Sequence, residues 1–176
     1  MFKGSIAEQL KSFAVEIHAF AMMGNHVHLL LTSREEKAGM LFLRNVLGTH
    51  AKQMNLLVGY RGSLWQTRYH SVAVETDSHA LHACLYIDAN PWRAFAVDHP
   101  QESSWTSYRE LAHGGETTFV TPHPVLMALG DGDSWRSRYK EIMAEYLRRG
   151  SRSICPGRRI SKVDPLAGLR LASWNL

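Results

Sequence analysis

Residues 15–32 read VEIHAFAMMGNHVHLLLT, and this stretch decides the fold. Two runs rich in strand-forming side chains, residues 15–22 and 26–32, flank Gly24-Asn25, a pair that is typical of tight hairpin turns. We therefore predict an antiparallel hairpin. Side chains two apart on a strand point to the same face, so His26 and His28 should lie side by side, while Val27 and Leu29 face the core.

The periodicity of the flanking sequence predicts further helices and a third strand. A short helix is expected at residues 5–13, and an amphipathic helix at residues 35–57, ended by Gly59. A strand follows at residues 69–75, then a helix capped by Asp77 or Ser78 that ends near Asn90, because Pro91 disfavours helical geometry before it. This order indicates an α+β fold of the ferredoxin-like, split βαβ kind with an antiparallel sheet that lacks its first strand. The buried face of the long helix should carry Met40, Leu43, Leu47, Ala51 and Met54.

Length and charge divide the chain unequally. Its 176 residues, 45% of them hydrophobic, suffice for one catalytic domain, which we place at residues 1–115, and a basic helical C-terminal extension at 116–176. Residues 1–120 carry 10 basic and 11 acidic side chains, a net charge of −1, whereas residues 121–176 carry 10 and 5, a net charge of +5. An acid-free basic run in the extension is typical of phosphate-backbone contact, the alternative being a solvated chain end. The run comprises Arg148, Arg149, Arg152, Arg158, Arg159 and Lys162.

Composition also excludes several classes of protein. The two cysteines, Cys84 and Cys155, rule out a disulfide scaffold and fit a reducing compartment. No run approaches the roughly 20 apolar residues that span a bilayer. Charged and polar side chains interrupt the first 31 residues, which therefore do not read as a signal peptide. We expect a cytoplasmic protein with no membrane partner.

Three segments carry candidate chemistry. His26 and His28 suit two ligands of one divalent ion, although a polar exposed strand face would show the same spacing. Tyr86 and Asn90 lie four apart on one helical face, where a phenol and an amide could reach one metal site; the alternative is a core tyrosine with its hydroxyl at the surface. Residues 61–70, RGSLWQTRYH, alternate basic and aromatic side chains as in single-strand binding sites, or form a turn with Trp65 in the core.

In this order, the segments resemble a known family. Residues 21–31 with their His-hydrophobe-His pair, the GSLWQ segment with Arg68, residues 86–94 reading YIDANPWRA, and the WTSY segment at 105–108 are similar to single-tyrosine transposases. The resemblance spans residues 14–112. It points to the branch of these insertion-sequence transposases that is associated with repetitive extragenic palindromes.

The resemblance implies a metal-dependent enzyme that cleaves and rejoins single-stranded or hairpin DNA. His26 and His28 match the family's metal-binding histidines, Asn90 matches the polar residue that completes the Mg²⁺ or Mn²⁺ site, and Tyr86 matches the nucleophile. Attack by Tyr86 would leave a 5′-phosphotyrosine, whose bond retains the energy needed for rejoining. The candidate DNA contacts of this chain are Arg61, Trp65, Arg68, Arg93, Arg148, Arg149, Arg158 and Arg159, with Trp92 as a further stacking surface.

Two other functions fit the same residues. One is a DNA-hairpin-binding protein that no longer cuts, and the other is a metal phosphodiesterase in which water replaces the tyrosine. Monomers and homodimers both occur in the family. The relatives begin with a strand that is central in the sheet, whereas helix-like sequence follows Met1 directly. The resemblance therefore leads us to expect either a start codon upstream of Met1 or a truncated protein with unpaired central strands.

Overall fold

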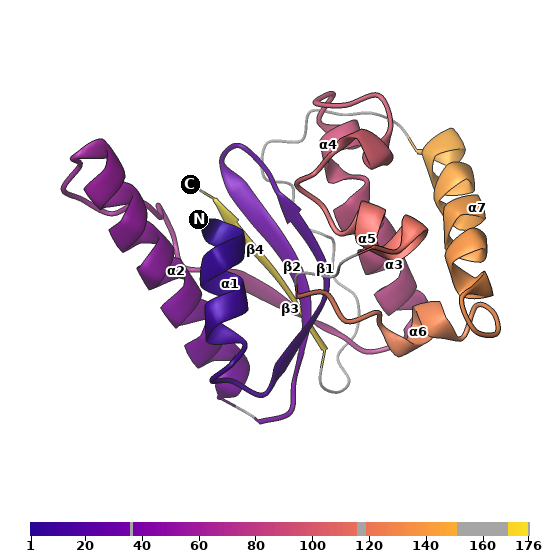
Figure 1. Ribbon diagram of the computed structural model, residues 1–176, viewed down its shortest axis with the longest axis horizontal. Coiled ribbons are helices and arrows are strands. Elements are labelled where there is room, and N and C mark those ends of the chain that lie inside the picture. The colour runs from indigo at the N-terminus through magenta and orange to yellow at the C-terminus, as the bar shows by residue number, and fades with distance from the viewer. Residues whose placement is uncertain (36, 116–118, 151–168, 176) are drawn as a thin grey trace.

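A computed structural model of the protein describes residues 1–35, 37–115, 119–150 and the backbone of 169–175. It confirms the α+β class, with a four-stranded sheet and helices on both of its faces (Figure 1).

The expected hairpin forms the centre of the structure. β1 (Val15–Met22) pairs antiparallel with β2 (His26–Ser33), and Met22 lies opposite Val27 next to the turn. The backbone N–H of Met23 donates to the carbonyl of His26 at 2.8 Å and closes the turn. Local signals, two strand-forming runs on either side of a Gly-Asn turn, were sufficient to predict the hairpin, but its register also shifts between Ile17 and Ala19, which these signals do not predict.

The sheet contains a fourth strand where a gap was expected. The strand order is β1-β2-β4-β3, with β4 (Leu169–Asn175) antiparallel to β2 and to β3 (His70–Val74). No strand precedes the first helix among the described residues, as expected, but the position beside β2 is filled from the other end of the chain. The expectation of unpaired central strands is therefore wrong for this structure. The C-terminal extension also ends in a strand and is not helical throughout.

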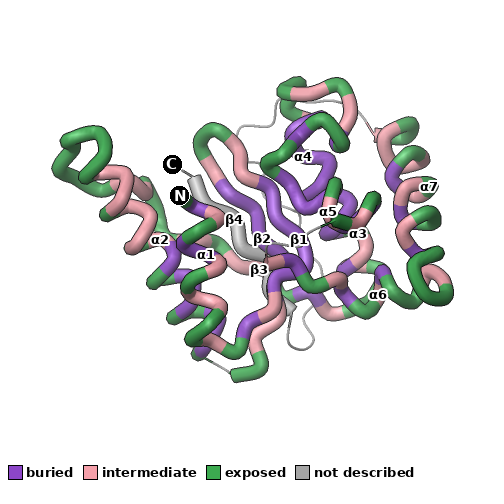
Figure 2. Tube along the Cα trace, in the orientation of Figure 1, coloured by how far each residue is buried: buried purple, intermediate pink, exposed green. Residues whose placement is uncertain are grey.

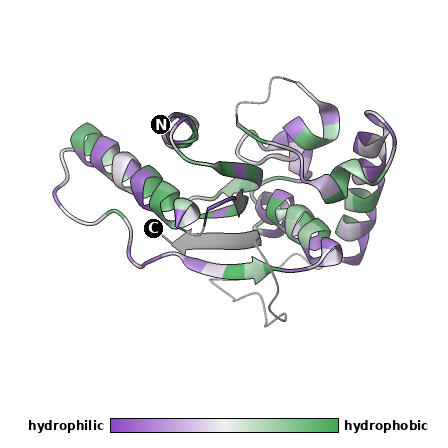
Figure 3. Ribbon diagram, turned by 90° about the horizontal axis from the view of Figure 1, so that it is seen from below, coloured by the Kyte–Doolittle hydropathy of each residue, from purple (hydrophilic) through white to green (hydrophobic). Residues whose placement is uncertain are grey.

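The helices form a layer on each side of the sheet. α1 (Phe2–Gln9) and α2 (Ala38–Val58) cover one face. The other face carries α3 (Asp77–Asp88), α4 (Asn90–Arg93), the 3-10 turn η1 (Pro100–Glu102), α5 (Tyr108–His113), α6 (Pro124–Met127) and α7 (Ser134–Arg149). Figure 3, seen from below, shows α2 and α3 on opposite sides of the stacked strands.

The two helical layers explain why β1 and β2 are buried along most of their length (Figure 2). Phe20, Leu29 and Leu30 are inaccessible to solvent. Strands covered on both faces need apolar side chains at nearly every position, not only at alternate ones. The run from Leu29 to Leu31 meets that need.

The helix boundaries differ from the predicted ones in ways that local contacts explain. α1 begins three residues earlier than expected, because Phe2 and Ile6, four apart, supply its buried stripe. On α2, Leu43 is buried as expected but Met40 is 47% exposed, and Phe42 and Val46 pack inward in its place. Gly59 ends α2 in the left-handed conformation with φ 65°, as predicted.

No helix in the described part of the chain is both long and apolar enough to cross a bilayer. The described portion of the C-terminal extension consists of α6, α7 and β4. Arg152, Arg158, Arg159, Lys162 and Cys155 lie outside the described residues. The division between domain and extension at residue 115 stays a prediction.

Candidate functional site

The histidine pair lies on the face of β2 that α3 covers. The ring centroids of His26 and His28 are 4.8 Å apart with nearly perpendicular planes. Nδ1 of His26 is hydrogen-bonded at 2.7 Å to Oδ1 of Asn25 in the turn. Because a carbonyl oxygen only accepts, this bond places the His26 proton on Nδ1 and leaves Nε2 with a lone pair. Strand geometry thus produces the side-by-side pair that the sequence predicts.

His28 is the more enclosed of the two histidines. Its side chain is 7% exposed, and its Nδ1 is buried without a hydrogen-bond partner. Burial, with a smaller contribution from the neighbouring His26, lowers the pKa of His28 to about 3. His28 is therefore uncharged at neutral pH, the state in which an imidazole nitrogen can bind a cation.

Tyr86 reaches this pair from α3. The helix begins at a side-chain cap, in which Oγ1 of Thr76 accepts from the backbone N–H of His79 at 3.1 Å, so the cap lies one residue before the predicted ones. Its buried stripe fixes the rotation of α3, and half-buried Tyr86 then lies with its ring centroid 5.7 Å from that of His28. The structure therefore brings the candidate nucleophile to the histidine pair.

Asn90 is held next to Tyr86 by a backbone contact. α3 ends at Asp88, close to the predicted end, but Asn90 begins the short helix α4 with Pro91 in its first turn, so Pro91 does not exclude helical geometry from Asn90 as predicted. Nδ2 of the buried Asn90 donates to the carbonyl oxygen of Tyr86 at 2.9 Å. Since the amide nitrogen is used in this way, Oδ1 is the atom that Asn90 can offer to a ligand.

The donor set fits a hard divalent cation. It consists of a fixed imidazole on His26, an unpartnered buried nitrogen on His28 and the amide oxygen of Asn90. In the described ranges no cluster of three histidine, cysteine or carboxylate side chains occurs, so the amide would have to supply the third protein ligand. Mg²⁺ accepts such sparse protein ligation, because it keeps several waters and also binds substrate phosphate.

A cation and a second phenol complete the surroundings of Tyr86. The guanidinium carbon of Arg93, on α4, lies 5.5 Å from the centre of the Tyr86 ring. Burial raises the pKa of Tyr146 on α7, and the positive charge of the nearby Arg93 opposes this rise. Sequence reasoning named Arg93 but missed Tyr146, because no local pattern marks a contact more than 50 residues away.

A buried carboxylate that sequence reasoning also missed lies beneath this site. Asp88 is inaccessible to solvent; Oδ1 accepts from the Ser107 hydroxyl at 2.5 Å and Oδ2 from the Tyr139 hydroxyl at 2.7 Å. Burial raises the pKa of Asp88 to about 7, although both hydrogen bonds oppose the shift. These bonds connect α3 to the start of α5 and to α7. The four-residue spacing of the buried Trp135, Tyr139 and Met143 on α7 is a sequence signal of this face.

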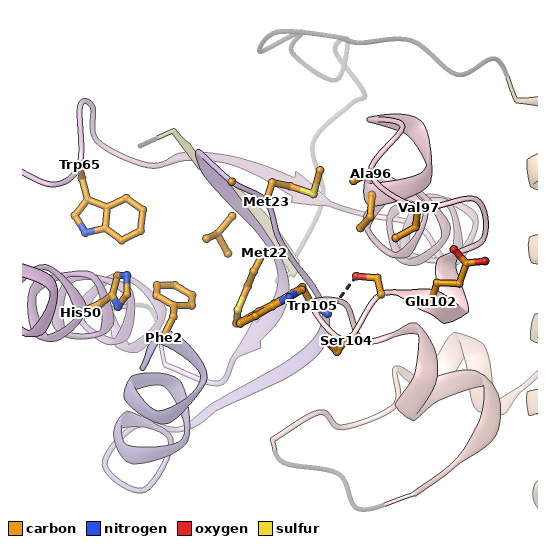
Figure 4. Close-up of a pocket in the computed structure, with 14 residues that line it drawn as sticks. Phe2, Met22, Met23, His50, Trp65, Ala96, Val97, Glu102, Ser104 and Trp105 are labelled. Atoms are coloured by element: carbon orange, nitrogen blue, oxygen red, sulfur yellow. Dashed lines mark hydrogen bonds between the residues drawn. The ribbon is translucent and has the colours of Figure 1, made fainter. Parts of the chain in front are cut away.

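The tip of the hairpin borders an open cavity of about 560 Å³ (Figure 4). Met22 and Met23 lie in its middle, with Trp65 on one side and Val97 on the other. Trp65 is half-buried, its Nε1 donates to the carbonyl of Leu47 at 3.0 Å, and its ring packs on Phe2. Packing thus accounts for Trp65, and its ring also reaches the cavity wall.

The predicted DNA contacts are dispersed. Arg61 and Arg68 are exposed in the loop from the far end of α2 to β3, across the sheet from α3 (Figure 1). Trp92 is 8% exposed, which favours packing over base stacking. Arg148 and Arg149 are exposed at the end of α7, where both are paired with Glu145. Of the predicted arginines that the structure describes, Arg93 is the one in contact with Tyr86.

The antiparallel α+β sheet carries a histidine-tyrosine site, and a family comparison identifies the family of the chain. The chain belongs to the IS200-like transposases: residues 1–90, about half of the 176, match the family model described as Transposase IS200 like. That match includes His26, His28, Tyr86 and Asn90. No curated protein and no solved structure matches the chain.

Proposed function

We propose that this protein cleaves and rejoins single-stranded DNA, including strands folded into hairpins, through a 5′-phosphotyrosine on Tyr86. The observation that carries the proposal is the convergence of three elements: the His28 ring on β2 lies within 5.7 Å of the Tyr86 ring on α3, and Asn90 at the start of α4 is bonded to the Tyr86 backbone. Membership of a transposase family supports the reaction class.

The chemistry assigns a role to each side chain. The phenol of Tyr86 loses its proton to solvent as its oxygen attacks phosphorus, the bond from phosphorus to the 3′ oxygen breaks, and the departing oxygen takes up a proton from solvent. Attack by a 3′-hydroxyl on the phosphotyrosine reverses these steps and releases Tyr86, so no nucleotide cofactor is needed. His26, His28 and Asn90 would hold Mg²⁺ or Mn²⁺; the bound ion would polarise a non-bridging phosphate oxygen.

The proposal predicts a covalent adduct. Purified protein is incubated with Mg²⁺ or Mn²⁺ and single strands labelled at the 3′ end, drawn from a pool of hairpin-forming palindromes and from a random pool. A labelled band that survives denaturant is expected, because the 3′ fragment carries the 5′-phosphotyrosine. Tyr86→Phe should abolish the band while DNA affinity changes less than a few-fold, since only the attacking oxygen is lost.

The other two functions give different results in the same experiment. A hairpin-binding protein would bind the strands and leave them intact. A water-using phosphodiesterase would cut them without an adduct, and Tyr86→Phe would cut at a similar rate. Tyr69→Phe is a matched control, because Tyr69 precedes β3 and lies outside the site.

A further inference from the structure

The WTSY segment contains one side chain that packing does not account for. The three residues at 106–108 are buried. Trp105 is 59% exposed, although its backbone is fixed at the edge of the hairpin. Its carbonyl accepts from the backbone N–H of Met22 at 2.8 Å, and its own N–H donates to the Ser103 hydroxyl at 3.1 Å. The indole is therefore held in a defined place while most of it stays exposed.

The Trp105 indole forms part of the wall of the cavity at the hairpin tip (Figure 4). The volume of this cavity, about 560 Å³, lies within the roughly 300–1,000 Å³ that is typical of ligand sites. On the side of α1 and α2, the rings of Phe2, His50 and Trp65 pack on one another. The ring of Trp105 is exposed instead, so a flat ligand in the cavity has access to it.

The cavity adjoins the candidate site along the chain. Val27, which lies between the two site histidines, lines the cavity, and so does Pro91, which directly follows Asn90. A DNA strand whose phosphate is bound at the candidate site therefore has its neighbouring nucleotides next to the cavity.

The charges around Trp105 favour a nucleotide in one orientation. Nζ of Lys3, on α1, lies 6.0 Å from the Trp105 ring centre and donates to the Ser104 carbonyl at 2.8 Å. An ammonium group has three donors, so Lys3 can bind a phosphate oxygen while it keeps this contact. Glu102, an acidic side chain in the lining, accepts from the backbone N–H of Asp98 at 3.1 Å. Its carboxylate repels a phosphate but can accept an N–H from a base.

We propose that the cavity at the hairpin tip binds one unstacked base of the cleaved strand, which stacks on Trp105 while Lys3 binds the adjoining phosphate. This inference rests on the proposed function. Every base has a π-face, and aromatic side chains bind single strands by stacking on it. A base within a duplex has both faces covered by its neighbours. The cavity therefore selects single-stranded DNA next to the phosphate that is cleaved.

The test measures DNA binding in the Tyr86→Phe background, so that the result does not depend on cleavage. The probe is the strand that the wild-type protein binds most tightly in a pool of hairpin-forming palindromes with single-stranded flanks. Trp105→Leu keeps an apolar side chain but removes the ring, and should weaken affinity roughly 5- to 150-fold, the range for stacking of one base. Trp105→Tyr should retain most of the affinity. The melting temperature should stay unchanged in both variants, because Trp105 is largely exposed.

An abasic scan locates the base. Each base of the probe is removed in turn, and one position close to the cleaved phosphate should weaken binding by the same factor as Trp105→Leu. At that position the two changes should not add, because both remove the same contact. Lys3→Gln keeps a donor for the Ser104 carbonyl but removes the charge, and should flatten the plot of log affinity against log salt by roughly 0.7.

Two controls separate stacking from a general loss of binding. Affinity for a long blunt-ended duplex should not change in Trp105→Leu, because the bases of the duplex are paired and stacked. Tyr60→Leu removes another exposed ring, 55% exposed beyond the end of α2 and outside the lining of the cavity. This variant should bind the probe as its parent does.

Several results would overturn the inference. Stacking on Trp105 is rejected by undiminished binding in Trp105→Leu, by an equal loss in Trp105→Tyr or Tyr60→Leu, by an equal loss of duplex binding, or by additive effects at every abasic position. An unchanged salt dependence in Lys3→Gln rejects the phosphate contact. The proposed function fails separately, if the wild-type protein binds the probe and forms no adduct. Absence of any binding to single strands rejects both.

Discussion

His26 and His28 are prepared for a shared cation by different means. A hydrogen bond that His26 donates to Asn25 in the turn fixes its ring, whereas burial keeps His28 neutral and leaves its Nδ1 without a partner. An unpartnered buried nitrogen costs free energy, which a ligand at this position would recover.

This pair can be tested by metal binding without DNA. Calorimetric titration of the His26→Ala/His28→Ala variant with Mn²⁺ should show at least a ten-fold weaker affinity than the wild type, because two of three protein ligands are lost. His113→Ala, at an exposed position on α5, is the control and should bind as the wild type does. Undiminished binding by the double variant would show that these histidines are not ligands.

A third histidine of the hairpin serves the fold. His18 is buried, with Nδ1 donating to the Thr121 carbonyl at 2.8 Å and Nε2 accepting from the Thr32 hydroxyl at 2.7 Å. Burial lowers the pKa of His18, against opposing effects of the Thr121 hydrogen bond and the charge of Glu16. The folded protein therefore holds His18 neutral at pH values where the unfolded chain protonates it.

Because the pKa of His18 is lowered in the folded protein, the free energy of unfolding should fall as the pH falls. Below about pH 6.5 the unfolded state binds a proton that the native state excludes, so the stabilisation by His18 is present at higher pH and is lost as the pH falls. Urea unfolding of wild type and His18→Asn should show a free-energy difference that shrinks from pH 7.5 to 5.5, by at most about 1.4 kcal/mol per pH unit. A difference for His18→Asn that does not change with pH would contradict the assignment.

For the helices and strands, the sequence predicted well those features that depend on contacts between residues close together in the chain. β1, β2 and the shared face of His26 and His28 were predicted correctly, because alternation and turn chemistry act within 18 residues. The end of α3 near Asn90 was also predicted. The approach of His28 to Tyr86 was implied by resemblance alone, since β2 and α3 meet through the packing of the whole layer.

The contacts of α7 show why the rest could not be predicted. Tyr139 donates to Asp88, 51 positions away in the sequence, and the Tyr146 ring meets that of His82, which is also remote in the sequence. Such pairs depend on how α3, α5 and α7 dock, which no spacing rule encodes. Likewise, Asp88 reads as an ordinary helix-terminal acid until its burial is known.

The arginines at the end of α7 provide a prediction at this scale. Arg148 and Arg149 both pair with Glu145 and remain largely exposed, so each can exchange this partner for a phosphate. The Arg148→Ala/Arg149→Ala variant should bind single-stranded DNA more weakly, and its plot of log affinity against log salt should flatten by roughly 0.7 for each lost contact.

The matched control lies on the same helix. Arg138 is exposed and paired with Glu141 in the same way, two to three turns before the basic end. Arg138→Ala removes a single arginine from a comparable setting. If the salt dependence of binding flattens as much for Arg138→Ala as for each arginine of the double variant, the effect is a general one of net charge. An unchanged slope in the double variant would reduce the end of α7 to a passive surface.

The sheet at the centre of the molecule includes β4, a strand from the C-terminal part of the chain. β4 pairs with residues 26–32 of β2 on one side and with residues 70–74 of β3 on the other. Both neighbours run antiparallel to it, as they do to the central first strand of the split βαβ pattern. His26 and His28 of the candidate site therefore lie on β2, between β1 and β4.

Hydrogen exchange of the intact protein tests this arrangement. Backbone amides of residues 169–175 should be protected to the same degree as those of β2, because a central strand opens only with the whole sheet. Fast exchange of these amides beside a protected β2 would show that β4 does not hold the central position. In that case, the in-frame DNA before Met1 would be the place to look for the strand that does.

Proline substitution tests the same strand through its backbone. Ala172 pairs with Leu29 on one side and Ser71 on the other, so Ala172→Pro removes one ladder N–H and displaces the chain beside β2. Each buried backbone group left unpaired costs about 1–3 kcal/mol, so two or three of them would consume much of the 5–15 kcal/mol that holds a small domain folded. Ala172→Pro should therefore abolish a cooperative melting transition and Mn²⁺ binding together, whereas Ala172→Gly, which keeps the amide, should retain both. Retention of both by the proline variant would mean that the catalytic sheet folds without β4.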